Sequence, residues 1–225
     1  MKVALCFSGM PRYVAQTYNY WRKCVLDVYA PDVFVHTWCD HDQADSLKSQ
    51  LFSQYAPVSC VVQPEMPQDV SIYKERIWPH RTTPAGVLSQ WYSVKHALQQ
   101  RKQHEVLKGF TYDVVIRARF DWFLEQVSLE QNDAWNIAHT PTLAGHKFTL
   151  RGQPLVGIND QFGYGASHTA DVVSELFDHI PNLYQNEQVD FCSELFLKAH
   201  MHMNNIEIKH HVWNNGMVRW WGVNP

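Results

Sequence analysis

The sequence predicts an α/β fold, built on a mainly parallel sheet flanked by helices, with antiparallel additions in its C-terminal half. In the first half, short apolar runs alternate with segments of helical periodicity, which is typical of parallel strands joined by crossover helices. After Asp121 the segments become short and mixed, which favours antiparallel strands. The length of 225 residues, of which 45% are hydrophobic, suits one domain, 1–225, with a large core.

The elements expected in the first half follow one another as strand and helix. Strands are expected at Lys2–Ser8, Asp32–Trp38, Ser59–Gln63 and from Tyr112, and helices at Tyr13–Tyr29, Ala44–Tyr55 and Pro84–Lys108. The third helix has the clearest limits, because Thr83 is a cap residue, Pro84 suits the first helical turn and Gly109 suits a helix stop. The segment 63–84 before it is rich in proline and polar residues, so it is expected to be a long loop of the kind that is often functional.

The second half is expected to add short strands and two helices to this framework. Strands are expected at Trp135–His139, Lys147–Leu150, Leu155–Ile158 and Ile206–Trp213, a loop or short strand at Asn159–Gly165, and helices at Ser167–His179 and Asp190–Met203. The sequence contains no internal repeat and no low-complexity segment.

The composition argues against several classes of protein. A formal net charge of −3 and a pI near 6.5 give no basis for nucleic-acid binding. No apolar run approaches the roughly 18 residues that span a bilayer. The five cysteines are scattered and form no C-x-x-C pair, so the sequence suggests neither a zinc cage nor a disulfide framework. We therefore expect a cytoplasmic protein without a transmembrane segment. Four histidines near the C-terminus lack the spacing of a zinc motif and are mostly expected on the surface: His200, His202, His210 and His211.

The stretch Tyr112–Asp121 combines a buried strand with charged residues at its end. Side chains alternate along a strand, so Arg117, Arg119 and Asp121 are expected on one face. Arginine forks suit phosphate oxygens, and an aspartate beside them can hold a divalent metal or a sugar hydroxyl. The alternative is an internal Arg–Asp ion pair that closes the strand end.

The turn after the first strand is a second candidate for ligand binding. In an open α/β sheet, ligands bind beyond the C-terminal ends of the strands, where a helix N-terminus and Arg12 offer donors to phosphate. The candidate residues are Ser8, Gly9, Pro11 and Arg12. The glycine patterns of the Walker and Rossmann loops are not present. The alternative is a sharp turn with Arg12 in solvent.

Aromatic and basic residues on two further elements complete the expected donor site. His36 and Trp38 end the second strand, where Trp38 can stack on a base; the alternative is a buried tryptophan and a hydrogen-bonded histidine. Tyr92 and Lys95 are three residues apart on the long helix and share a face, from which Lys95 can meet a phosphate. The alternative is that aromatic residues at this spacing belong to the core.

Carboxylates late in the chain are candidates for proton transfer. Asp160 lies in a glycine-flanked segment, and Asp190 and Glu194 are four apart, near the start of the last expected helix. A carboxylate there can act as a general base toward an acceptor hydroxyl. The alternative is a helix cap at Asp190 beside a glutamate stabilised by the helix dipole.

Five stretches occur in an order that resembles a known group of proteins. They are Val-Ala-Leu-Cys-Phe-Ser-Gly-Met-Pro-Arg at 3–12, Asp-Val-Phe-Val-His-Thr-Trp at 32–38, Gln-Trp-Tyr-Ser-Val-Lys at 90–95, Tyr-Asp-Val-Val-Ile-Arg-Ala-Arg-Phe-Asp at 112–121 and Asn-Asp-Gln-Phe-Gly-Tyr-Gly at 159–165. Together they resemble bacterial and viral glycosyltransferases of the GT-A type, the kind found near surface-polysaccharide genes. The resemblance covers the first two thirds of the chain well and the C-terminal third loosely.

The resemblance implies a GT-A-like fold with a Rossmann-like N-terminal half. Residues 1–121 would bind the nucleotide and residues 122–225 would face the acceptor. It also implies that Asp121 occupies the place of the Asp-x-Asp metal motif, which would bind Mg²⁺ or Mn²⁺. Arg119 stands where the first aspartate of that motif would be, so the metal stays an open question, and the arginines can themselves neutralise a diphosphate.

The function expected from these features is glycosyl transfer from a nucleoside-diphosphate sugar to a hydroxyl of a glycan acceptor. The catalytic candidates are Asp121, Asp160, Asp190 and Glu194. One alternative is a carbohydrate- or nucleotide-binding module without turnover. Another is a sulfotransferase, which would need more phosphate-binding residues after the first strand than the single Arg12.

Overall fold

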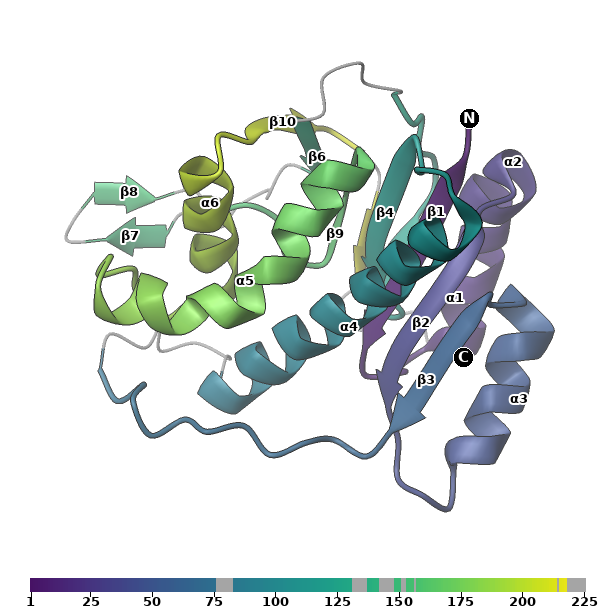
Figure 1. The fold of residues 1–225 in the computed structure, drawn as a ribbon, viewed down its shortest axis with the longest axis horizontal. Helices are drawn as coiled ribbons and strands as arrows, with labels where there is room; N and C mark the ends of the chain where they lie inside the picture. The colour runs from purple at the N-terminus through teal and green to yellow at the C-terminus, as the bar shows by residue number, and fades with distance from the viewer. Residues whose placement is uncertain are drawn as a thin grey trace.

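The fold is organised around one seven-stranded sheet (Figure 1). A computed structural model of the chain describes residues 1–75, 83–130, 137–141, 148–150, 153–155, 157–213 and 215–217. In spatial order the sheet contains β10 (Glu207–His211), β6 (Ile137–Pro141), β9 (Phe162–Gly165), β4 (Val114–Arg119), β1 (Val3–Gly9), β2 (Asp32–Trp38) and β3 (Ser59–Gln63).

The direction of the strands confirms the predicted fold class. β4, β1, β2 and β3 are parallel neighbours, and β6 and β10 are parallel to each other. β9 is antiparallel to both β4 and β6, between which it lies. The fold is therefore mixed α/β, with a mostly parallel sheet and its antiparallel addition in the C-terminal half.

Helices cover both faces of the sheet (Figure 1). Their bounds are α1 (Val14–Trp21), the π-helical segment η1 (Arg22–Leu26), α2 (Asp27–Tyr29), α3 (Ala44–Tyr55), α4 (Pro84–Lys108), α5 (Ser167–Gln185) and α6 (Ser193–Met203). Side chains of α4, α5 and α6 form one apolar core with the sheet, and those of α1 and α3 form a second core on the opposite face.

Strand β4 shows how the alternation of side chains sorts residues between these two cores. Val115 packs into the core beneath α4 and α5, whereas Val114 and Ile116 pack into the core beneath α1 and α3. Arg117 and Arg119, two and four residues after Val115, therefore lie on the α4 face. This face is the one on which the candidate site is built.

The long helix α4 has the predicted limits, and local chemistry explains them. The Thr83 side chain accepts a hydrogen bond from the Gly86 N–H at 3.1 Å, which caps the first turn beside Pro84. Gly109 ends the helix with a φ of 68°, in the left-handed region that glycine adopts without strain. In the preceding segment residues 64–75 form neither strand nor helix, as expected for a loop, while 76–82 lie outside the described residues.

Three predicted helices differ in detail from those observed. The helix expected at 13–29 starts one residue later, because Tyr13 has a left-handed φ of 60°, and contains the π-helical turn η1. Helix α5 continues through Pro181 to Gln185, because Leu183 and Tyr184 are buried and their packing outweighs the proline. Helix α6 begins at Ser193 rather than Asp190, which removes Asp190 from the helix.

The short strands of the second half were only roughly placed by the sequence. β6 lies two residues later than expected, β10 ends at His211, and β8 (Gln153–Leu155) pairs with β7 (Phe148–Leu150) ahead of the expected 155–158. β5 (Trp122–Leu124) and β11 (Asn215–Met217) were not predicted; they pair with each other in antiparallel fashion, which joins distant parts of the chain. Among the described helices, none is both long and apolar enough to cross a membrane.

Candidate functional site

The candidate site lies at one edge of the sheet, where several elements end or begin together. The parallel strands β1, β2 and β4 have their carboxyl ends at this edge, and β9 starts there because it runs in the opposite direction. The N-terminal half of α4 lies over the same edge, since Ser93 contacts both β1 and β2. Sheets of this kind bind ligands beyond the carboxyl ends of their strands.

The turn after β1 presents backbone close to open space. The Gly9 N–H donates to Ser93 Oγ at 2.7 Å, and the Gly9 carbonyl accepts from Thr37 Oγ1 at 2.7 Å. Gly9 has a φ of 90°, and a Cβ built there would meet nothing within 4 Å. The turn is therefore fixed from below by two side chains, while its upper side leaves room for a ligand to approach.

The predicted residues around this turn differ in their exposure. Ser8 is buried, Pro11 is half-buried and Arg12 is exposed. Within the described part of the chain, the Arg12 side chain forms no ion pair. Arg12 therefore offers an uncommitted guanidinium at the edge.

Arg119 and Asp121 form a bidentate ion pair at the end of β4. Arg119 Nε and Nη2 donate to the two Asp121 carboxylate oxygens at 2.9 and 2.6 Å. Asp121 is only 1% exposed. Burial acts to lower the pKa of Arg119, but the Asp121 carboxylate outweighs it, so the pKa of Arg119 is raised. The sequence left open an internal Arg–Asp ion pair at the end of this strand. That ion pair is present, and Arg119 rather than Arg117 forms it.

This ion pair bears on the metal that the sequence resemblance implies. Mg²⁺ and Mn²⁺ are held by carboxylate oxygens, carbonyls and water. Both oxygens of Asp121 already accept from Arg119, and no second aspartate stands two residues before it. A divalent cation at Asp121 would have to displace a guanidinium and sit beside its charge, so the residues present do not fit the ion.

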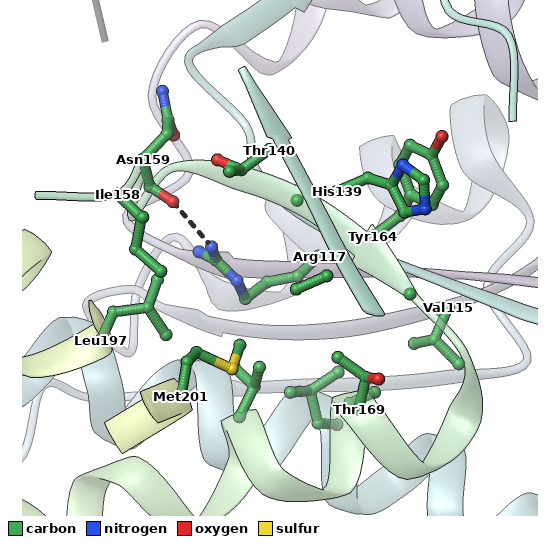
Figure 2. A pocket seen from close by; sticks show the side chains of 16 residues that line it. Val115, Arg117, His139, Thr140, Ile158, Asn159, Tyr164, Thr169, Leu197 and Met201 are labelled. Atoms are coloured by element: carbon green, nitrogen blue, oxygen red, sulfur yellow. Dashed lines mark hydrogen bonds between the residues drawn. The ribbon is translucent and has the colours of Figure 1, made fainter. Parts of the chain in front are cut away.

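Arg117 is directed inward and organises the segment that leads into β9 (Figure 2). It is 7% exposed and donates to the backbone carbonyls of Asp160 and Asn159, the latter at 3.2 Å. Its guanidinium also lies 5.5 Å from the centre of the Trp91 ring. Burial lowers the pKa of Arg117 to about 10. Its hydrogen bonds go to the protein backbone, so the position of Arg117 fixes where Asp160 stands.

Asp160 and Glu194 form the acidic centre of the site. Gln90 Nε2, on α4, donates to Asp160 Oδ2 at 2.8 Å, and Cys192 Sγ donates to Glu194 Oε2 at 3.0 Å. Burial, reinforced by the charge of Asp160, raises the pKa of Glu194 to about 7. The backbone at Gly157 packs against this glutamate so closely that a Cβ there would lie 2.6 Å from Glu194 Cβ.

Two predicted site residues are placed away from this centre. Asp190 is half-buried three residues before α6, whose N-cap is Cys192, so neither the expected helix cap at Asp190 nor its helical pairing with Glu194 is formed. Lys95 Nζ forms an ion pair with Asp178 of α5 at 2.6 Å. The ammonium group of Lys95 is therefore paired with a carboxylate of a neighbouring helix.

The aromatic residues at the end of β2 form a packed group. Trp38 is 2% exposed, and its ring stacks on that of Tyr92 with the centroids 5.4 Å apart. His36 Nδ1 lies 2.9 Å from Ser93 Oγ, and burial together with the nearby His96 lowers the pKa of His36 to about 4. The structure thus has the arrangement that the sequence left open as the alternative, a buried tryptophan and a hydrogen-bonded histidine. Tyr92 is half-buried.

Several polar residues of the site were missed by the sequence analysis. Gln90 and Ser93 lie on α4 three residues apart, and Ser193 Oγ accepts from Trp91 Nε1 at 2.9 Å. Asn159 Oδ1 accepts from the N–H groups of residues 161 and 162, which shapes the turn before β9. The signal that could have found Gln90 and Ser93 is their polarity within an otherwise apolar stretch of a helix expected to line the site.

A small cavity lies behind Arg117, between the sheet and helices α5 and α6 (Figure 2). Its volume is about 40 Å³, and apolar side chains such as Val115, Ile158 and Met201 provide most of its lining. Pockets for small-molecule ligands usually measure about 300–1,000 Å³, so this space is too small for a sugar.

Comparisons with known proteins give one family and a distant structural likeness. The profile of DUF7796, described as a domain of unknown function, matches residues 1–216. A search of the curated proteins found no match. Among the solved structures that match is a crystal structure of a glycosyltransferase involved in the glycosylation of the major capsid of PBCV-1, with 10% identity and a TM-score of 0.46, covering 94% of this chain and 82% of that chain. A likeness at this level carries no information about substrate or mechanism.

Proposed function

We propose that this chain, which belongs to the DUF7796 family of domains of unknown function, is a glycosyltransferase that moves a sugar from a nucleoside diphosphate to a hydroxyl of a glycan. The observation that carries the proposal is the Glu194 carboxyl, whose pKa is raised to about 7 at the carboxyl edge of a parallel sheet. A group with a pKa near neutrality can take a proton from a hydroxyl at an ordinary pH. Arg12, unpaired in the described structure, supplies positive charge at the same edge, and Arg119, whose charge is shared with Asp121, supplies a further N–H donor for a diphosphate.

The donor nucleotide is assigned to the ends of β1 and β2 on the α4 face. Gly9 allows a close approach of the ligand to the backbone, and the exposed Arg12 offers its guanidinium to the diphosphate. The half-buried ring of Tyr92, which stacks on that of Trp38, is the aromatic side chain assigned to contact the base. The diphosphate then extends toward Arg119 at the end of β4.

The acceptor hydroxyl is assigned to the space between Glu194 and the donor sugar. The hydroxyl oxygen forms a bond to the anomeric carbon, the bond from that carbon to the diphosphate oxygen breaks, and the hydroxyl proton passes to Glu194. Asp160, held in place by Gln90, accepts a hydrogen bond from a sugar hydroxyl. The charge that develops on the departing diphosphate is offset by Arg119, whose bidentate pair with Asp121 fixes its orientation.

No step of this scheme uses a metal ion at Asp121. The donor set there does not fit Mg²⁺ or Mn²⁺, because Arg119 occupies both carboxylate oxygens. The proposal therefore assigns to the arginines the charge neutralisation that a cation provides in other transferases.

The proposal is tested in two stages. Thermal-shift measurements with UDP, GDP, CDP and adenosine 3′,5′-bisphosphate identify the nucleotide that raises the melting temperature. Sugar derivatives of that nucleotide are then assayed for release of the nucleoside diphosphate, with and without glycan acceptors. We expect stabilisation by a nucleoside diphosphate and acceptor-stimulated release. Stabilisation without release would mean a binding module, and a response to the adenosine bisphosphate alone would favour a sulfotransferase; either result would overturn the proposal.

A further inference from the structure

A second group of side chains with ligand chemistry lies outside the site described above. Glu130 follows β5, His139 belongs to β6 and His211 ends β10. One ligand atom from each, a carboxylate oxygen and two imidazole nitrogens, lies within 4.8 Å of the others. Three segments of the chain thus bring their metal-binding atoms to one point.

This group is on the other side of the sheet from Arg117 and Glu194. The ring of His139 stacks on that of Tyr164 with the centroids 4.4 Å apart, and Tyr164 belongs to the core beneath α1 and α3. His211 stacks on Trp213 at 4.6 Å, and Trp213 packs against the same core. Arg117 belongs to β4, the neighbour of the strand β9 that carries Tyr164, and lies on the opposite face of the sheet, beneath α4. The two groups therefore cannot share one ligand.

The neighbouring side chains hold the three residues in place. The Glu130 N–H donates to the Tyr164 hydroxyl at 3.2 Å, so the residue that stacks on His139 also anchors the backbone of Glu130. His139 is buried, His211 is half-buried and Glu130 is exposed. A ligand would thus be reached from solvent on the Glu130 side and backed by aromatic rings on the other.

The chemistry of these atoms matches one class of ion. Two imidazoles with one carboxylate are a frequent donor set for Zn²⁺, which binds nitrogen at about 2.0–2.1 Å and usually takes four ligands. Ligand atoms of a tetrahedral zinc site are then roughly 3.3 Å apart. His139 Nδ1 and His211 Nε2 lie 2.7 Å apart, so the two rings need to separate by only about half an ångström. Mg²⁺ prefers an all-oxygen shell and does not suit this set.

We propose that Glu130, His139 and His211 bind a zinc ion, whose fourth position is filled by water. The ion would join β10 and the segment after β5 to β6. β5 precedes the segment that contains Glu130, and β11 follows His211; these two strands pair with each other. β5 begins directly after Asp121. Zinc would therefore stabilise the C-terminal strands around the candidate site without taking part in sugar transfer. The inference does not depend on the proposed function.

The test compares metal binding by matched variants of the full chain. Protein stripped of metal with a chelator is titrated with Zn²⁺, and with Co²⁺ as a spectroscopic probe, and its melting temperature is measured with and without each metal. We expect one Zn²⁺ per chain, visible absorption bands of four-coordinate Co²⁺, and a higher melting temperature with Zn²⁺ but not with Mg²⁺. Glu130→Gln and His211→Asn are each expected to weaken Zn²⁺ binding by at least about tenfold.

His210→Asn is the control, because His210 is the exposed neighbour of His211 on β10. It should bind Zn²⁺ as the unmodified chain does. Glu130→Gln keeps the test decisive if His211→Asn fails to fold, since Glu130 is exposed. The proposal is overturned if the unmodified chain takes up no Zn²⁺, if Glu130→Gln binds it as tightly as the unmodified chain, or if His210→Asn weakens binding as much as His211→Asn. Any of these would leave a stack of histidines with a structural role only.

Discussion

The molecule contains two buried arginine clusters, and they are built differently. The first lies between α4 and α5, where Arg101 is fully buried and donates to Glu105, Ser167 and Asp171 at 2.6–2.7 Å. Lys102 adds a second bond to Asp171 at 2.6 Å. Two cations face two carboxylates, and side chains of the two helices accept from both terminal nitrogens of Arg101, while its buried Nε has no hydrogen-bond partner among the described residues. This cluster has the features of a closed structural network.

The second cluster lies at the edge of the sheet, where acidic groups outnumber basic ones. Arg117 and Arg119 lie beside Asp160 and Asp121, and Glu194 adds a third carboxyl next to Asp160. Arg117 donates to backbone carbonyls and Arg119 pairs with Asp121. Among the described residues Glu194 forms no ion pair, and its nearest charged neighbour is Asp160. The pKa of Glu194 is raised to about 7 as a result of burial and this neighbour. The two clusters thus differ in their balance of charge, which is even between α4 and α5 and acidic at the edge of the sheet.

The largest effect is expected from Arg101→Leu in the closed cluster. The change leaves Glu105 buried without its cation, and removing one partner of a buried ion pair costs about 3–5 kcal/mol. Urea unfolding should show this loss in the free energy of unfolding, while nucleotide affinity at low temperature stays unchanged. Lys102→Ala is the control, because that lysine is half exposed and should cost less than about 1 kcal/mol. A cost below 1 kcal/mol for Arg101→Leu would show that the first cluster does not stabilise the fold.

The next effect is expected from Glu194→Gln in the edge cluster. The amide keeps the size of the side chain but cannot take a proton, so turnover should fall roughly 100-fold or more with nucleotide affinity unchanged. Turnover of the unmodified enzyme should rise with pH through about 7, because the base must be ionised. The matched control is Asp190→Asn, since Asp190 precedes α6 and should leave the rate unaltered. Equal losses in both variants, or none in Glu194→Gln, would contradict the assignment.

The same glutamate gives a prediction about stability and pH. Its folded pKa of about 7 lies above the value of 4.5 for a free side chain, so the folded chain holds this proton to a higher pH than the unfolded chain. The contribution of Glu194 to stability is therefore fully present below pH 4.5 and is lost as the pH rises through 7. Glu194→Gln has no such proton, so its melting temperature relative to that of the unmodified chain should increase between pH 5 and pH 8. A difference that is constant over this range would mean that Glu194 titrates normally.

The parallel half of the fold could be predicted because its signals are local. Strand and helix periodicity, the Thr83 cap and the Gly109 stop all act within a few residues, and the structure has these elements where they were expected. The pairing of β5 with β11 depends on residues about ninety positions apart, and nothing in either short segment identifies its partner. The extension of α5 beyond Pro181 likewise depends on tertiary burial, which outweighs local propensity.

The site was predicted in parts for the same reason. Arg119 and Asp121 are two residues apart, so their pairing could be read from the alternation of a strand. The proximity of Asp160 and Glu194 requires the register of β9 and the close packing at Gly157, neither of which a local pattern reveals. Lys95 and its ion-pair partner Asp178 are 83 residues apart in the sequence. The sequence therefore could not show whether Lys95 is paired or available to a ligand.

A smaller effect is expected from comparing Arg12→Ala with Lys95→Ala. Both residues were predicted to contact donor phosphates, but only Arg12 is exposed without an ion pair in the described structure. Arg12→Ala should weaken nucleotide binding by about 1–3 kcal/mol, the range for charge-assisted hydrogen bonds. Lys95→Ala should change it by less than about 0.5 kcal/mol, because Lys95 would have to leave Asp178. Calorimetry with the nucleoside diphosphate decides between them, and an equal loss in both would return Lys95 to the donor site.

The smallest effect is expected from Mg²⁺ and Mn²⁺, whose addition tests whether Arg119 or a cation neutralises the diphosphate. Arg119 holds both oxygens of Asp121, so a cation there would have to break two charge-assisted hydrogen bonds and then face the released guanidinium. We expect nucleotide affinity to change by less than about twofold, roughly 0.4 kcal/mol, when either ion is added at millimolar concentration. Arg119→Lys is the informative variant, because a point charge cannot hold both oxygens and should lower transfer activity. Mn²⁺ could instead raise nucleotide affinity tenfold in the unmodified chain and not in Asp121→Asn. That result would show that the Arg119–Asp121 ion pair breaks to let Asp121 bind the metal, and that nucleotide binding depends on the cation.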